Sequence, residues 1–307
     1  MIEGSVTAVA KGDGDGDDVT VHLDRRTSWR TEHAMSDFTT TRLGDRVAFD
    51  HRGSGPALIF VAGAGPFRAI DPWTTETAEA AAAQGISTIV YDRLGRGESP
   101  ASGRIGLDRE LAALEALIDV AGGPAVLCGH SSGCTISLAA TDRGLAVNGA
   151  ALWEAPIGGT VGGVGPWVAE VERRIDAGDL EGALVHYMKD MPPEWLEEAR
   201  HDPGFPEYVA QVVSYVADGE SLVWAESAAF ADAAAGIRVP VLAMVGEQTF
   251  DEIRSAADDL AAGIPGARVR VMPGADHTWE PVPMADELAA FVTACATSAT
   301  MPARGRA

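Results

Sequence analysis

Residues 125–140 read AVLCGHSSGCTISLAA, and this stretch decides the fold. The apolar run at 125–128 is typical of a buried strand, and the small and apolar residues after Gly133 have helical spacing. Gly129 and Gly133 flank Ser131, because a side chain at either position would collide with a tightened backbone. The stretch predicts a strand, a sharp turn and a helix, with Ser131 lifted clear of the sheet. We interpret Ser131 as a nucleophile.

The composition limits the class of protein. At 307 residues, the chain is long enough for one large α/β domain with an insertion, and 46% hydrophobic residues predict a packed core. A formal net charge of −22 argues against a nucleic-acid or anionic-membrane partner, because like charges repel. No run approaches the ~18 apolar residues of a membrane span, and the N-terminus has no signal-peptide pattern. We therefore expect a cytoplasmic protein.

No metal site is predicted. The three cysteines, Cys128, Cys134 and Cys295, form neither a disulfide framework nor a metal-binding spacing, and we expect buried structural thiols beside the serine turn. The aspartates of GDGDGDD at residues 12–18 lack the closing Glu and the helical flanks of an EF-hand loop.

Strand patterns alternate with helix patterns along most of the chain. The predicted strands are residues 46–51, 58–61, 87–91, 125–128, 150–153, 239–245 and 268–272. The predicted helices between and after them are residues 74–84, 108–120, 250–262 and 283–296. This order predicts an α/β fold with a mostly parallel sheet and helices on both faces.

Residues 157–236 interrupt that rhythm. Helical patterns at 167–177, 180–188, 206–217 and 221–234 follow one another without a strand, so we expect a helical cap over the strand ends, between the sixth and seventh strands. The division is then an extension (1–34), a core (35–156 and 237–298), the cap (157–236) and a tail (299–307). Large side chains gather in and before the cap, and a minority should line a substrate pocket. The candidates are Trp153, Trp167, Met188, Met191, Trp195, Tyr208 and Trp224.

A serine hydroxyl needs a base within hydrogen-bond reach. In a parallel sheet, functional groups collect at the carboxyl ends of the strands, and His277 follows the last predicted strand. The other histidines lie in the extension, on an early strand or in the cap, apart from His130, for which we expect a structural role. We therefore interpret His277 as the base.

Four motifs in this order resemble the α/β-hydrolase superfamily over roughly residues 38–296. They are GHSSG (129–133), DRLGRGES (92–99), PGADH (273–277) and GAG (63–65). The resemblance implies a nucleophile elbow at Ser131 and a histidine loop at His277. It also implies an oxyanion hole built from the N–H groups of Ser132 and of either Gly63 or Ala64.

The acid of the triad departs from the family pattern. The segment after the penultimate strand is GEQT, so Thr249 stands where family members commonly carry Asp. One replacement is Glu154, since a carboxylate at the end of a buried strand needs a partner. The other is Asp251, which otherwise complements the dipole of a helix that Thr249 and Glu252 would cap. We favour Glu154, because the zearalenone-type lactone hydrolases resemble this chain in combining an S-S-G elbow with Glu in an E-x-P context.

The sequence therefore predicts a cytoplasmic, cofactor-free serine hydrolase that cleaves a carboxylic ester or lactone through an acyl-enzyme. The partner is a small, mainly apolar substrate. The alternative is a non-hydrolytic protein of the same fold: a cofactor-free perhydrolase, a natural-product cyclase or a ligand-binding receptor.

Overall fold

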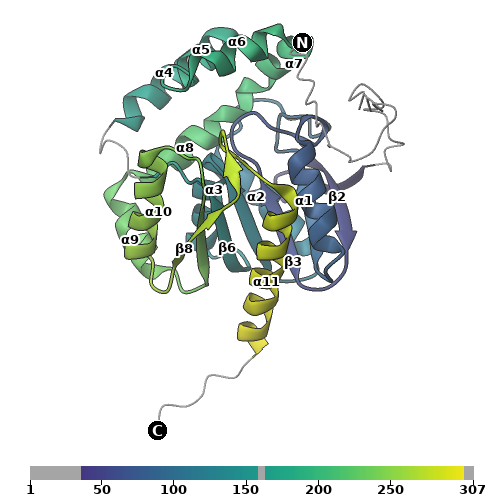
Figure 1. The fold of residues 1–307 in the computed structure, drawn as a ribbon. Helices are drawn as coiled ribbons and strands as arrows, with labels where there is room; N and C mark the ends of the chain where they lie inside the picture. Colours follow the sequence, from purple (N-terminus) through teal and green to yellow (C-terminus); the bar gives the residue numbers. More distant parts are fainter. Residues whose placement is uncertain (1–35, 158–162, 301–307) are drawn as a thin grey trace, which may run out of the picture.

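Continuous apolar runs form the middle strands of one eight-stranded sheet (Figure 1). The computed structural model describes residues 36–157 and 163–300. The strands are β1 (Asp37–Thr40), β2 (Arg46–Gly53), β3 (Ala57–Val61), β4 (Ser87–Tyr91), β5 (Ala125–His130), β6 (Val147–Trp153), β7 (Val241–Gly246) and β8 (Arg268–Met272). Their order is β1-β2-β4-β3-β5-β6-β7-β8, with β2 antiparallel to both neighbours and all other pairs parallel. The predicted, mostly parallel sheet is confirmed.

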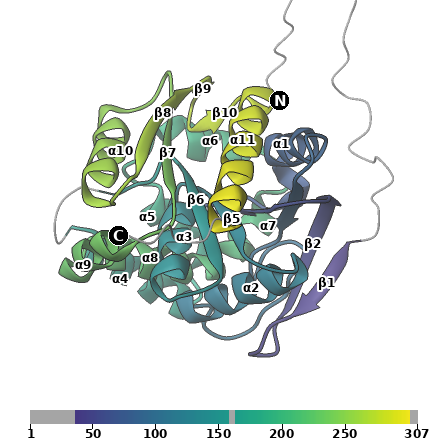
Figure 2. The same cartoon turned by 90° about the horizontal axis from the view of Figure 1, so that it is seen from below.

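Helices cover both faces of the sheet, as Figure 2 shows from below. They are α1 (Pro72–Ala82), α2 (Leu107–Val120), α3 (Ser132–Asp142), α10 (Asp251–Gly263) and α11 (Pro281–Thr300). In β3, Leu58 and Phe60 pack with residues of α1 and α11, whereas Ile59 and Val61 pack with residues of α2 and α3. Because successive side chains point to opposite faces, a strand with two covered faces reads as a continuous apolar run.

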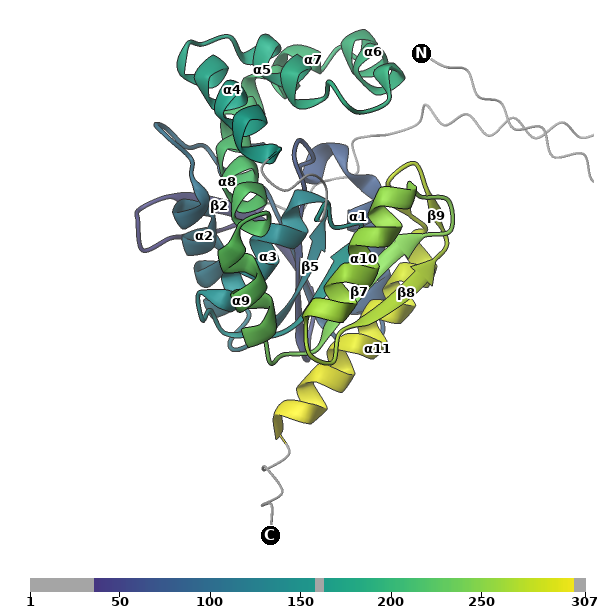
Figure 3. The ribbon, with the colours of Figure 1, turned by 90° about the vertical axis from the view of Figure 1, so that its left-hand side faces the viewer.

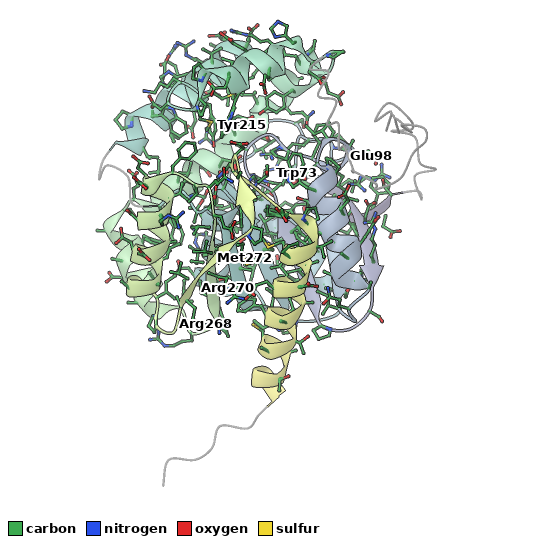
Figure 4. The ribbon with its side chains drawn as sticks, viewed as in Figure 1. Trp73, Glu98, Tyr215, Arg268, Arg270 and Met272 are labelled. Atoms are coloured by element: carbon green, nitrogen blue, oxygen red, sulfur yellow. The ribbon has the colours of Figure 1, made fainter. Side chains whose placement is uncertain are left out.

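The edge strand β8 differs from the buried strands. Arg268, Arg270 and Val271 are exposed, and only Met272 is buried (Figure 4). Charged side chains on an edge strand discourage pairing with another chain.

The turn between β5 and α3 depends on glycines at three crowded positions. A Cβ on Gly133 would lie 2.0 Å from the Val61 carbonyl oxygen, and one on Gly129 would lie 2.6 Å from the Cys134 nitrogen. A Cβ on Gly63 would lie 2.9 Å from the Ser131 Cβ. The backbone of β3, the turn and α3 therefore approach too closely for any side chain at these positions.

The described residues between β6 and β7 form helices and no strand, as predicted. These helices are α4 (Val164–Asp176), α5 (Leu180–Tyr187), α6 (Pro193–His201), α7 (Phe205–Ala210), α8 (Tyr215–Ala225) and α9 (Ala228–Gly236). Figure 3 shows α8 running beside α3, with α4 to α7 above the sheet. Tyr208 of α7 lies against Gly65, in the loop after β3, which places the insertion over the carboxyl edge of the sheet.

Some helix boundaries in this insertion were predicted wrongly. The predicted break between residues 217 and 221 lies inside α8, and α6 was not predicted. Gly219 is helical there, and a Cβ on it would lie 2.7 Å from Val168 Cγ1 of α4. This glycine permits close packing of two helices, which its sequence neighbourhood does not reveal.

Several predictions concern the ends of the chain and the thiols. The predicted extension at 1–34, with GDGDGDD, and residues 301–307 of the predicted tail lie outside the described residues. All three cysteines are free and buried, and burial raises the pKa of the Cys128 thiol to about 12. No helix of the described residues is both long and apolar enough to cross a membrane.

We predict that Gly133→Ala destabilises the protein strongly. The new methyl group would overlap the Val61 carbonyl, and such overpacking of a rigid backbone costs roughly 2 kcal/mol or more. Thermal unfolding of the purified variant measures the effect. Gly263→Ala is the control, since Gly263 is exposed at the end of α10 with open space around it, and should change the stability by less than about 1 kcal/mol. Equal melting temperatures for the two variants would contradict the packing argument.

Candidate active site

Ser131 occupies the apex of the turn between β5 and α3, with φ of 53° and ψ of −127°. Its N–H donates to the Trp153 carbonyl at 2.9 Å, and its carbonyl accepts from the Cys134 N–H at 2.9 Å. These bonds tie the turn to the end of β6 and to the first turn of α3. Ser131 remains partly exposed, so a ligand can reach its hydroxyl.

His277 and Glu154 form a short hydrogen bond at the site. His277 Nδ1 donates to Glu154 Oε2 at 2.6 Å, and the Gly246 N–H donates to Glu154 Oε1 at 3.0 Å. The glutamate side chain is 1% exposed and the histidine side chain 22% exposed. Among the described residues, neither Ser131 Oγ nor His277 Nε2 has a hydrogen-bond partner. The two atoms therefore do not bond to each other in this structure, and the contact between serine and base expected from the sequence is not formed.

His277 lies in a two-residue hairpin turn. The short strands β9 (Gly274–Ala275) and β10 (Thr278–Trp279) pair antiparallel, and Asp276 and His277 connect them with φ of 51° and 64°. Positive φ at both central residues defines a type I′ turn, whose second central position is usually Gly. A histidine at that position therefore adopts a backbone conformation that carries a cost in strain.

Strained backbone is concentrated at this site. In the described part of the chain, the non-glycine residues with positive φ are Ser131, Glu154, Asp276 and His277. Each such conformation costs on the order of 1–3 kcal/mol and persists only when the surrounding structure enforces it. These residues come from three separate segments, which the fold brings to one edge of the sheet.

Glu154 is held as a carboxylate. Burial alone would raise its pKa, but the hydrogen bond from His277 and the donors at Thr249 and Gly246 outweigh that effect and lower the pKa. Thr249 Oγ1 is buried beside the carboxylate, although its contact falls short of hydrogen-bond geometry. A buried anion next to an imidazole fixes the tautomer, so that Nε2 is the unprotonated nitrogen of neutral His277.

The alternative acid, Asp251, is placed elsewhere. It is exposed in the first turn of α10, where a negative charge complements the helix dipole, and His277 Nδ1 is bonded to Glu154 instead. The predicted capping box of Thr249 and Glu252 is wrong, because α10 begins at Asp251 and is preceded by Phe250 without a side-chain cap.

The backbone N–H groups proposed for the oxyanion hole flank Ser131. Ser132 is the first residue of α3 and is fully buried. Gly63 lies against the Ser131 side chain, and Ala64 follows it in the same loop. The N–H groups at the start of α3 have no intrahelical acceptor, so that end of the helix stabilises negative charge.

The His277 carbonyl is fixed by two donors from neighbouring strands. His130 Nε2 donates to it at 3.0 Å, and Trp153 Nε1 donates at 3.2 Å. Burial and the nearby His277 ring lower the pKa of His130 to about 3, so His130 stays neutral. His130 therefore supports the histidine loop, which agrees with the structural role expected from the sequence.

Residues 58–294 match the sequence profile of the alpha/beta hydrolase family. The chain belongs to this family. No curated protein matches it by sequence. A solved alpha/beta hydrolase from Sphaerobacter thermophilus is 28% identical, with a TM-score of 0.70 over 83% of this chain and 99% of that one.

Two further solved members of the fold have named activities. An enol-lactonase from Burkholderia xenovorans is 19% identical, with a TM-score of 0.60 over 85% of this chain and all (100%) of that one. A thermophilic esterase from Thermogutta terrifontis is 20% identical, with a TM-score of 0.56 over 87% of this chain and 98% of that one. At these identities the likeness shows only that this chain shares their fold.

The predicted pocket residues do not all come together. Trp167, Met188, Met191 and Tyr208 belong to one apolar cluster of the insertion, which also contacts Ala64 in the loop after β3. Trp195 is partly exposed on α6.

The other two predicted pocket residues lie apart from this cluster. Trp153 is fully buried beneath the histidine loop. Trp224 packs edge-on against Phe230 and lines a groove with Thr141 at the far end of α3 from Ser131. The structure therefore does not place Trp224 with the other candidates.

Sequence reasoning missed a set of buried charges that contact the loop after β3. Arg93 and Arg96 belong to the DRLGRGES motif, and both are fully buried with Asp218 of α8. Two arginines in a buried loop require acidic partners, but no spacing in the sequence identifies Asp218 as one. In the described residues, no group of three or more His, Cys, Asp or Glu side chains is arranged to hold a metal ion.

We predict that His130 makes the folding stability of this protein sensitive to acid. Its pKa is about 3 when folded and ~6.5 when unfolded, so between these values the unfolded chain binds more protons. The free energy of unfolding therefore falls as the pH drops below ~6.5, by roughly 2 kcal/mol at pH ~5. Urea denaturation of wild type and of His130→Gln at pH ~5 and ~8 measures this effect.

Glutamine does not titrate, so the loss of unfolding free energy caused by His130→Gln should be smaller at pH ~5 than at pH ~8. His201→Gln changes a histidine exposed on α6 and should keep the wild-type trend. A wild-type to His130→Gln difference that is the same at both pH values would contradict the prediction.

Proposed function

We propose that this hydrolase cleaves a carboxylic ester or lactone through an acyl-enzyme formed on Ser131. The observation that carries the proposal is the 2.6 Å hydrogen bond between Glu154 and His277. The His277 carbonyl is bonded in turn to His130, the residue before Ser131, which lies in a strained turn. A base oriented by a buried acid is what a serine nucleophile requires.

In the proposed mechanism, Ser131 Oγ attacks the carbonyl carbon and His277 Nε2 accepts its proton. Glu154 stabilises the imidazolium through Nδ1, and the N–H groups of Ser132 and of Gly63 or Ala64 bind the oxyanion. His277 then protonates the departing alcohol. The same residue activates the water that hydrolyses the acyl-enzyme and regenerates Ser131.

The substrate class rests on the residues near the site. The apolar cluster that contains Trp167, Met188 and Tyr208 reaches Ala64, which favours an acyl or alcohol group that is mainly apolar. The acid after β6 resembles that of the zearalenone-type lactone hydrolases, and the solved neighbours include an enol-lactonase and an esterase. We therefore propose esters and lactones ahead of amides. The free, buried cysteines fit our proposal of a cytoplasmic location.

The first test is covalent labelling. A fluorophosphonate should modify the wild-type protein once, detected by intact mass, because an activated serine attacks phosphorus as it attacks a carbonyl. Ser131→Ala should abolish the labelling. Ser137→Ala removes another buried hydroxyl of α3 and should leave it unchanged. A folded wild-type protein that is never labelled would exclude the serine-hydrolase proposal and favour a ligand-binding receptor.

The second test ranks the two acids. Glu154→Gln should lower kcat on p-nitrophenyl esters by roughly 10²–10⁴-fold with little change in KM, since the acid acts on the imidazolium formed in the transition state. Asp251→Asn is the control, which should stay within about threefold of wild type because the residue lies on the surface. The opposite ranking would assign the acid to Asp251. Assaying the same proteins on a lactone panel separates lactonase from esterase activity.

A further inference from the structure

A buried carboxylate of the helical insertion contacts two arginines of the core. Asp218 Oδ1 accepts from Arg93 at 2.6 Å, and Asp218 Oδ2 accepts from Arg96 at 3.0 Å. All three side chains are 0% exposed. The Arg96 guanidinium also lies 5.9 Å from the centroid of the Tyr215 ring, which Figure 4 labels where the insertion meets the core. Arg93 also forms an ion pair with Glu110, with 3.2 Å between Arg93 Nε and Glu110 Oε1.

The two arginines hold the loop that follows β3. Arg93 donates to the Ala62 and Gly63 carbonyls at 3.1 and 3.2 Å. Arg96 donates to the same Gly63 carbonyl and, at 3.2 Å, to the Pro66 carbonyl. Charge-assisted hydrogen bonds of this kind are stronger than neutral ones.

Fixing the Gly63 carbonyl also fixes the N–H of Ala64. The two groups belong to one planar trans peptide unit and point in opposite directions. Since both arginines bind the carbonyl from the buried side, the Ala64 N–H is directed away from them. This geometry favours Ala64 over Gly63 as the second oxyanion donor.

Asp218 reaches the other side of the oxyanion hole as well. Ser132 Oγ donates to Asp218 Oδ1 at 2.7 Å, and the backbone N–H of Ser132 is the first proposed donor. The Asp218 carboxylate therefore bonds directly to Ser132, whose N–H is one proposed oxyanion donor. It also bonds to Arg93 and Arg96, which hold the peptide unit that carries the other donor, the Ala64 N–H.

We propose that Asp218 is a positioning residue that sets the geometry of both oxyanion donors from helix α8. The inference rests on the proposed hydrolase function. Simple attachment of α8 to α3 does not require this arrangement, because the Thr135 and Ser221 hydroxyls already join the two helices at 2.7 Å. A buried ionic cluster is a weak source of stability, which favours a role in specifying geometry.

The test compares three variants on a p-nitrophenyl ester. Asp218→Asn should lower kcat by about 10- to 100-fold at nearly constant KM, because the oxyanion forms only in the transition state. Ser132→Ala keeps the backbone N–H and loses the link to Asp218, so its kcat should fall by a smaller factor. Ser221→Ala, the matched control between α3 and α8, should keep the wild-type kcat.

A second readout distinguishes positioning from structural damage. A trifluoromethyl ketone forms a tetrahedral adduct with an activated serine, so its affinity should fall by the same factor as kcat in Asp218→Asn. A folded Asp218→Asn with wild-type kcat and wild-type ketone affinity would overturn the proposal. If that variant does not fold, Ser132→Ala decides: a kcat below that of Ser221→Ala supports positioning, and equal values overturn it.

Failure of the proposed function itself would look different. In that case the wild-type protein would neither turn over esters nor react with a fluorophosphonate. An active wild type with an unaffected Asp218→Asn would reject the positioning role alone.

Discussion

The hydrogen bond between Glu154 and His277 joins two segments that are not neighbours in the sheet. Glu154 follows β6 and His277 follows β8, with β7 between them. The glutamate reaches across the end of β7, where the Gly246 N–H donates to it and a Cβ on Gly246 would lie 3.1 Å from Oε1. Its position therefore depends on a small residue at the end of β7, and on the hairpin turn that holds His277 at positive φ.

The fold and the positions of the candidate site residues could be predicted from the sequence for physical reasons. A strand that is buried on both faces is a continuous apolar run, and a parallel sheet brings strand ends to one edge. These two rules, with the motifs shared with the α/β-hydrolases, predicted that Ser131, His277 and Glu154 lie at one edge of the sheet. Glu154 was a candidate acid because a carboxylate at the end of a buried strand needs a partner, and the preference for it over Asp251 came from the resemblance to lactone hydrolases. The structure bonds Glu154 to His277.

The insertion was less predictable, because helices can pack in many registers against a sheet. Its helices were expected, but Asp218 was not identified as the partner of Arg93 and Arg96, since that pairing depends on how α8 lies on α3. The close packing of Gly219 against α4 was not predicted for the same reason. Trp224 was predicted to line the substrate pocket, but it lies in a groove at the far end of α3. The glycines around Ser131 indicated its strained turn, but the positive φ of Glu154, Asp276 and His277 was not predicted from the sequence.

Helix α8 is joined to the core differently from the rest of the insertion. The chain leaves the core just after β6 and returns at β7, and α4 to α7 lie over the carboxyl edge without joining the sheet. Tyr208 of α7 packs against Gly65 of the core, whereas the buried carboxylate of α8 forms ion pairs and a hydrogen bond with core residues. A substitution at Asp218 therefore removes a buried ion-pair partner of Arg93 and Arg96, whereas a substitution on an exposed face of α4 to α7 leaves no buried charge unpaired.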